Sequence, residues 1–256
     1  MNPEFRTRGA RTRLAPLALL ALTATGLTGC TLAHAPASVE CPGQPLVSFV
    51  AIDGSGSSRT STIYEERLAV IEDIAHRTAL CNGRLTVTGF SVSSSATVTL
   101  LDHTFAVKGS TDRARARKAP EAVEPVMEDI RASYDASLAS LSNSGTDVLG
   151  AYQQVADYKH QLPTEAALEA TILTDGLQNM DALALDPANL DRETTESLVE
   201  DLDLPDLAGV TITLSGVGQV SGTPLTSTET AGLIEFYDLV CQNTNAASCL
   251  TVTDWR

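Results

Sequence analysis

The chain has 256 residues, of which 43% are hydrophobic and 19% charged, and this composition supports a sizeable core and excludes global disorder. Its 32 acidic and 17 basic residues give a formal net charge of −15. Because this charge repels phosphate backbones, the sequence predicts that nucleic acid is not a partner.

The first 29 residues have the organisation of an export signal. Four arginines precede the apolar run Leu14–Leu22, and small residues then lead to Cys30. The apolar run is shorter than the roughly 20 residues that a membrane-spanning helix needs. We therefore predict a signal peptide over residues 1–29.

The four residues that end at Cys30 resemble a bacterial lipobox, in which the cysteine becomes the mature N-terminus and carries lipid. The resemblance implies a lipoprotein on the extracytoplasmic face of a bacterial cell membrane, held only by acyl chains such as palmitate at Cys30. An ordinary secretory signal with an unrelated cysteine is the alternative. Residues 30–44 are predicted to form a tether, and residues 45–256 to form the folded domain.

Strands and helices are predicted to alternate along this domain. Apolar runs and alternating segments predict strands at Leu46–Ile52, Leu85–Ser91, Ala96–Leu101, Ala170–Thr174 and Gly209–Gly218. Apolar residues at helical spacing predict helices at Ile63–Leu80, Ala122–Leu141, Asp147–Tyr158 and Thr228–Cys241. This order predicts an α/β fold with a doubly wound, mostly parallel sheet. The second and third strands form a hairpin, so one edge strand is expected to be antiparallel.

Two charged segments interrupt the alternation. Arg113–Lys118 is basic, and Asp186–Asp206 contains eight acidic residues beside Arg192. We expect both segments to be solvated loops, with the acidic one lying as an insertion over one edge of the sheet. A secondary cation site or a partner surface is the alternative for the acidic segment.

Three segments next to predicted strands or helices carry side chains with hard oxygen donors. The first strand is followed by Asp53, Ser55 and Ser57, while Thr146 precedes a helix and Asp175 follows a buried strand. Ligands of doubly wound sheets bind where the parallel strands end, so these side chains are expected to converge. Hydroxyl and carboxylate oxygens suit Mg²⁺, Mn²⁺ or Ca²⁺ better than zinc or copper. A plain Gly/Ser turn is the alternative for the first segment alone.

In this pattern the sequence resembles the von Willebrand factor A-type domain with its metal-ion-dependent adhesion site. The resemblance covers about Pro45 to Val240 and rests on the motifs Asp53-Gly-Ser-Gly-Ser57, Gly145-Thr-Asp147 and Thr174-Asp-Gly176. It implies that a divalent cation, Mg²⁺ first and Mn²⁺ or Ca²⁺ as alternatives, is held by Asp53, Ser55, Ser57, Thr146 and Asp175. In this family an acidic side chain of a partner protein fills the remaining coordination position.

The cysteines fit an exported domain. Apart from Cys30, an even number remains, which predicts two disulfides with three connectivities; buried free thiols are the alternative. The topology implied by the resemblance places Cys41, Cys81 and Cys241 at the end of the sheet opposite the metal. We favour the pairs Cys41–Cys81 and Cys241–Cys249.

The resemblance and the composition together predict a membrane-anchored, extracytoplasmic protein that binds a protein partner through a divalent cation. We expect no enzymatic activity, because none of His34, His76, His103 and His160 lies beside Ser55 or Ser57 in the predicted layout. A metal-dependent phosphoryl hydrolase is the first alternative, although only Arg59 offers a basic group near Asp53. A cation-independent scaffold of the cell envelope is the second alternative.

Overall fold

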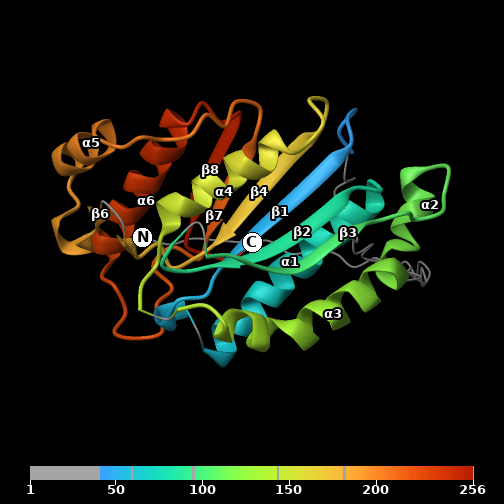
Figure 1. The fold of residues 1–256 in the computed structure, drawn as a ribbon, viewed down its shortest axis with the longest axis horizontal. Coiled ribbons are helices and arrows are strands. Elements are labelled where there is room, and N and C mark those ends of the chain that lie inside the picture. Colours follow the sequence, from blue (N-terminus) through green and yellow to red (C-terminus); the bar gives the residue numbers. More distant parts are fainter. Residues whose placement is uncertain (1–40, 59, 94–95, 143, 181–182, 256) are drawn as a thin grey trace, which may run out of the picture. The chain divides into compact units, whose positions relative to one another are not determined.

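A six-stranded sheet forms the centre of the fold. Its strands are β1 (Leu46–Asp53), β2 (Arg84–Phe90), β3 (Val98–Thr104), β4 (Ala167–Leu173), β7 (Thr211–Ser215) and β8 (Ser248–Val252), in the spatial order β3-β2-β1-β4-β7-β8 (Figure 1). This computed structural model describes residues 41–58, 60–93, 96–142, 144–180 and 183–255. The predicted signal peptide, Cys30 and the tether as far as residue 40 lie outside the described residues.

The pairing of the strands confirms the predicted fold class. Every neighbouring pair is parallel except β2 with β3, which are antiparallel. Strand β8 was not predicted, and it follows the helix that was expected to close the chain. This strand has only five residues, its sequence SCLTV lacks a long apolar run, and it gains its place by pairing with β7. The parallel strands begin at what we call the amino edge of the sheet and end at the carboxyl edge.

Helices cover both faces of the sheet. They are α1 (Ser61–Leu80), α2 (Asp112–Ala116), α3 (Ala119–Ala139), α4 (Val148–His160), α5 (Arg192–Glu200) and α6 (Ser227–Asn243). In Figure 1, α1 and α3 lie on one side of the sheet, and α4 and α6 on the other. Short 3-10 turns, η1 (Gly56–Ser58) and η2 (Pro187–Asn189), and a small hairpin of β5 (Asn179–Met180) and β6 (Leu183–Ala184) complete the described part.

Side-chain alternation along β1 divides the core between these two faces. Val47, Phe49 and Ala51 belong to the apolar cluster that includes α4 and α6. Val50 and Ile52 belong to the cluster that includes α1 and α3. All eight residues of β1 are buried, as expected for a central parallel strand with both faces covered. No helix in the described part of the chain combines the length and the apolar character needed to cross a membrane.

The two charged segments are more ordered than predicted. The basic segment was expected to be a loop, but it contains α2, which Thr111 caps by accepting a hydrogen bond from the Ala114 amide. Arg115 donates to the Leu80 carbonyl at 2.7 Å, so this side chain fastens α2 to the end of α1. The acidic segment forms η2 and α5, and α5 packs against α6.

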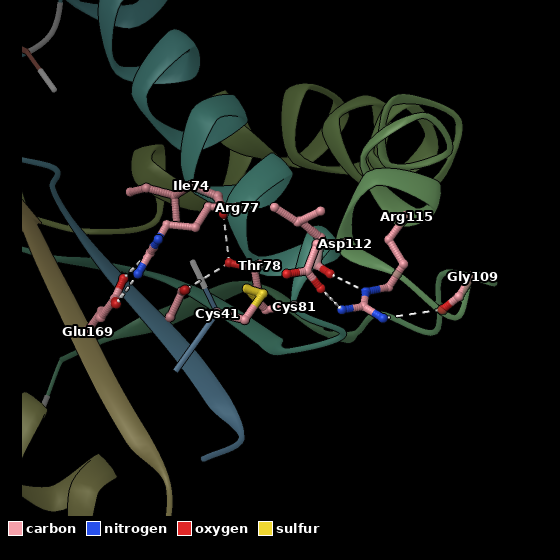
Figure 2. The surroundings of a disulfide bond; sticks show 11 residues. Cys41, Ile74, Arg77, Thr78, Cys81, Gly109, Asp112, Arg115 and Glu169 are labelled. Atoms are coloured by element: carbon pink, nitrogen blue, oxygen red, sulfur yellow. Dashed lines mark hydrogen bonds and ion pairs between the residues drawn. A yellow bond between two sulfur atoms is a disulfide. The ribbon is translucent and has the colours of Figure 1, made fainter. Parts of the chain in front are cut away.

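Both disulfides lie at the amino edge. Cys41, which precedes β1, is bonded to Cys81 at the end of α1, and Cys241 near the end of α6 is bonded to Cys249 in β8. These are the pairs that the sequence analysis favoured. Figure 2 shows further contacts around the first disulfide, where Arg77 forms a bidentate ion pair with Glu169 at 2.6 and 2.9 Å.

Candidate metal centre

The loops that carry the predicted ligands meet at the carboxyl edge and are joined by backbone hydrogen bonds. The Gly54 amide, directly after β1, donates to the carbonyl of Phe90 at the end of β2, at 2.8 Å. The Asp147 amide donates to the Ser91 carbonyl at 2.7 Å, which places the start of α4 beside the end of β2. The ends of β1 and β2 and the start of α4 are therefore fixed relative to one another.

Asp53 is the last residue of β1 and is completely buried. Its Oδ1 accepts the amide hydrogen of Ser55 at 2.8 Å, and its Oδ2 accepts the hydroxyl hydrogen of Thr174 at 2.8 Å. The hydroxyl oxygens of Ser55 and Ser57 lie 3.2 Å apart. These contacts fix the Asp53 carboxylate against the Thr174 hydroxyl and against the start of the loop that carries Ser55 and Ser57.

Asp175 follows β4 and is also completely buried. Its Oδ1 accepts from the Leu177 amide at 3.0 Å, and its carbonyl accepts from Gly218 in the loop after β7 at 2.8 Å. Burial, followed by the nearby Asp53 carboxylate, raises the pKa of Asp175 to about 6, while hydrogen bonds from the Ser57 hydroxyl and the Leu177 amide oppose this rise. Two buried carboxylates that repel each other attract a cation.

Thr146 belongs to the same edge through its backbone. Its amide donates to the Asn179 side chain at 2.8 Å, and its carbonyl accepts from the Asn179 amide at 3.1 Å. A Cβ at position 145 would lie 2.5 Å from the Met180 sulfur, so glycine there lets the Met180 and Asn179 side chains lie this close. Asp147 caps α4 by accepting from the Gly150 amide at 2.9 Å. Thr146 is buried where its backbone, just before α4, meets the loop after β4.

One charged residue at this site, Arg67, was not predicted from the sequence. Arg67 in α1 is completely buried, and its Nη1 donates to the Asp53 carbonyl at 2.8 Å. The centre of its guanidinium group lies 4.9 Å from the centre of the Trp255 ring. The spacing contained a signal, because Arg67 lies four residues from both Ile63 and Ile71 on the buried stripe of the helix.

The donor set fits a hard divalent cation. Two buried carboxylates and three hydroxyl residues, of which Ser57 is partly exposed, are the donors that Mg²⁺ and Ca²⁺ accept. The described residues contain no group of three or more His, Cys, Asp or Glu side chains that could hold a metal, so a zinc-type cluster is absent from this part. Within the same described part, the Ser91 hydroxyl is buried without a hydrogen-bond partner. A metal ion with bound water would supply such a partner.

The other residues singled out from the sequence lie elsewhere. His76 is in α1, His103 is in the edge strand β3 and His160 ends α4 at the amino edge. His34, Cys30 and Arg59 lie outside the described residues. The five residues predicted as ligands lie at the end of β1 or in loops at the carboxyl edge, and the described histidines belong to other parts of the fold.

Comparisons with known proteins add little to this geometry. No protein-family model matches the chain, and no curated protein matches it. Similar solved structures include the conserved hypothetical protein BatB from Bacteroides thetaiotaomicron, with 13% identity, coverage of 82% of this chain and 91% of that chain, and a TM-score of 0.38.

Two further structures are similar over part of their own length. Proximal thread matrix protein 1 from the mussel byssus is 15% identical, with coverage of 84% of this chain and 45% of that chain and a TM-score of 0.44. The pilus adhesin SpaC from Lactobacillus rhamnosus GG is 11% identical, with coverage of 82% and 28% and a TM-score of 0.44. This chain thus spans less than half of either protein. The interpretation of the site rests on its own residues.

Proposed function

We propose that this chain is a von Willebrand factor A-type domain that binds a protein partner through a divalent cation, Mg²⁺ first among the candidates. Asp53 and Asp175 hold the ion with the hydroxyls of Ser55, Ser57 and Thr146. The observation that carries the proposal is the pair of completely buried carboxylates at the carboxyl edge. Buried carboxylates are costly unless a cation or hydrogen bonds compensate them.

The bound ion supplies Lewis acidity at a position that the chain leaves to a ligand. Two carboxylates leave a divalent ion with affinity for a third, so an acidic side chain of a partner completes the site. The chain's own residues orient the ligands. The Thr174 hydroxyl and the Ser55 amide hold Asp53, and the Leu177 amide holds Asp175. This role is binding and involves no chemical conversion.

The hydrolase alternative lacks support in the described part of the chain. Besides the metal ion, phosphoryl transfer uses a basic side chain that stabilises the charge of the phosphate, and Arg67 does not suit this role, because it is completely buried and its Nη1 is bound to the Asp53 carbonyl. The described histidines lie outside the site. An assay of p-nitrophenyl phosphate hydrolysis with Mg²⁺ tests this alternative directly.

Titration calorimetry with Mg²⁺, Mn²⁺ and Ca²⁺ on the full chain in detergent tests the metal site. We expect saturable binding by the unchanged chain and its loss in Asp53→Ala and Asp175→Ala. Asp157→Asn on the exposed face of α4 is the matched control and should bind normally. Absence of binding by the unchanged chain would overturn the metal site and leave the cation-independent scaffold.

The partner and the anchor need separate tests. Crosslinking in intact cells should yield a product that depends on Mg²⁺ and disappears in Asp53→Ala, whereas a scaffold would keep its product after chelation. Incorporation of labelled palmitate should be lost in Cys30→Ser if Cys30 carries the lipid. A chain that incorporates no palmitate would be secreted instead, and this result would leave the metal proposal intact.

A further inference from the structure

Arg67 places a permanent positive charge beneath the candidate metal centre. Its side chain is completely buried, although it extends from a helix whose other charged residues are at least partly exposed. The Asp53 carbonyl accepts from its Nη1, and the Trp255 ring lies against its guanidinium. Arginine keeps its charge at every physiological pH, so this charge is a fixed property of the site.

The charges at the site can be added. Among the described buried residues, Asp53, Asp175 and Asp147 contribute three negative charges and Arg67 contributes one positive charge. A divalent cation brings this sum to zero with Arg67 in place and to one negative charge without it, so Arg67 removes a net repulsion of an anionic ligand. Asp147 caps α4, so the positive end of that helix offsets part of its charge. Because the site is buried, water screens the remaining charge only weakly.

We propose that Arg67 sets the charge of the metal-loaded site so that it takes one monoanionic carboxylate from the partner in preference to a neutral oxygen donor. This inference rests on the proposed function and deepens it. The same charge repels the cation, so Arg67 lowers the affinity for the metal while it raises the affinity of the loaded site for the acidic ligand. The domain therefore holds its ion most tightly when the partner is bound.

A purely structural role for Arg67 predicts a different result. If the side chain only holds the end of β1 through the Asp53 carbonyl, its removal should weaken metal binding and ligand binding together. If the charge of Arg67 matters, its removal should strengthen metal binding and weaken binding of the acidic ligand. The opposite signs separate the two roles.

The test compares Arg67→Met with Arg67→Lys in the full chain in detergent. Methionine keeps much of the apolar stem but removes the charge, whereas lysine keeps the charge and changes the geometry. Titration calorimetry with Mg²⁺ should show a dissociation constant at least tenfold lower in Arg67→Met and within about threefold of the unchanged chain in Arg67→Lys. Circular dichroism establishes that each variant is folded.

The second measurement uses the Mn²⁺-loaded chain with acetate and acetamide as probes. Water-proton relaxation reports displacement of metal-bound water by either probe. We expect acetate to bind the unchanged chain at least tenfold more tightly than acetamide, and to lose at least fivefold in affinity in Arg67→Met. Equal binding of acetate and acetamide would overturn the proposal, and this comparison does not require any variant to fold.

The measurements distinguish a failure of the proposed metal site from a failure of the proposed role of Arg67. If the unchanged chain does not bind Mn²⁺ or Mg²⁺, the metal site itself fails and this inference fails with it. If the unchanged chain binds the ion but Arg67→Met binds it equally or more weakly, the role of Arg67 is overturned and the metal site stands.

Discussion

The two edges of the sheet are stabilised by different means. The amino edge has two disulfides and the Arg77–Glu169 ion pair, so covalent bonds and paired charges hold it together. Among the described residues, the carboxyl edge has no disulfide and instead brings two buried carboxylates together. The contacts at the amino edge stabilise the fold, whereas the carboxyl edge keeps two carboxylates close that repel each other.

This difference indicates where the fold tolerates electrostatic cost. Disulfides stabilise mainly by restricting the unfolded chain, and this benefit is independent of where they lie in the native structure. Placing them at the amino edge leaves the loops at the carboxyl edge free of covalent restraint. The repulsion between Asp53 and Asp175 is then available to be relieved by a ligand, as proposed above.

The largest change in stability is expected from opening the longer disulfide. Replacing Cys41 and Cys81 together by serine should lower the free energy of unfolding by about 4 kcal/mol, because the bond closes a loop with a sequence separation of 40. Replacing Cys241 and Cys249 should cost about 2.5 kcal/mol, since that separation is 8. Urea unfolding measures both values. Mg²⁺ affinity should not change, and a loss of it would contradict the separation of the two edges.

At the carboxyl edge, removing a charge should stabilise the metal-free chain. Asp175→Asn should raise the free energy of unfolding by about 2 kcal/mol at pH 8 with EDTA, because its raised pKa reflects an ionisation that burial and Asp53 disfavour. The same variant should lose Mg²⁺ binding. Asp157→Asn is the control and should change stability by less than about 0.5 kcal/mol. A destabilised Asp175→Asn would mean that the carboxylates do not repel each other.

The pH dependence of the unchanged chain follows from the same residue. Because the folded pKa of Asp175 lies above its unfolded value, its contribution to stability is complete at low pH and is lost as the pH rises through about 6. With EDTA, this residue should cost about 1 kcal/mol between pH 5 and pH 7. Thermal unfolding at several pH values, compared with Asp175→Asn, isolates the effect. Saturating Mg²⁺ should reverse the trend, because the ion binds the ionised carboxylate.

The smallest effect is expected at the amino edge. Glu169→Gln removes the charge that pairs with Arg77, and both side chains are about one-third exposed. Solvent screens such pairs, so the free energy of unfolding should fall by about 0.5 kcal/mol. A urea titration with and without 1 M NaCl measures it. A loss above about 2 kcal/mol would show that this edge depends on the ion pair as much as on its disulfides.

Much of the fold could be predicted because its signals are local. The apolar run of β1 and the helical spacing of α1 depend on neighbouring residues in the sequence. Strand β8 could not be predicted in the same way, since its five residues gain stability from pairing with β7. The short helix α2 was missed because its charged residues are typical of a loop, and its position depends on the contact between Arg115 and the Leu80 carbonyl.

The candidate site likewise contains residues that could be predicted from the sequence and one that could not. Its ligands follow strand ends or precede a helix, so their order and chemistry were accessible from the sequence. Arg67 was not recognised, because a charged residue in an amphipathic helix is normally solvated. Its burial depends on Trp255, which lies 188 residues further along the chain, and on the backbone carbonyl of Asp53. Only the folded chain brings these groups together.

The disulfide between Cys41 and Cys81 also determines how the domain responds to mechanical force. A pull applied to the chain before Cys41 passes through the bonded sulfurs to the end of α1 as well as along the backbone into β1. The load is therefore shared between α1 and β1. The hydrogen bonds that join β1 to its two neighbouring strands then do not break one after another. While this bond is intact, the residues between the two cysteines cannot contribute their contour length to extension. Reduction should lengthen the unfolded chain measured by single-molecule stretching.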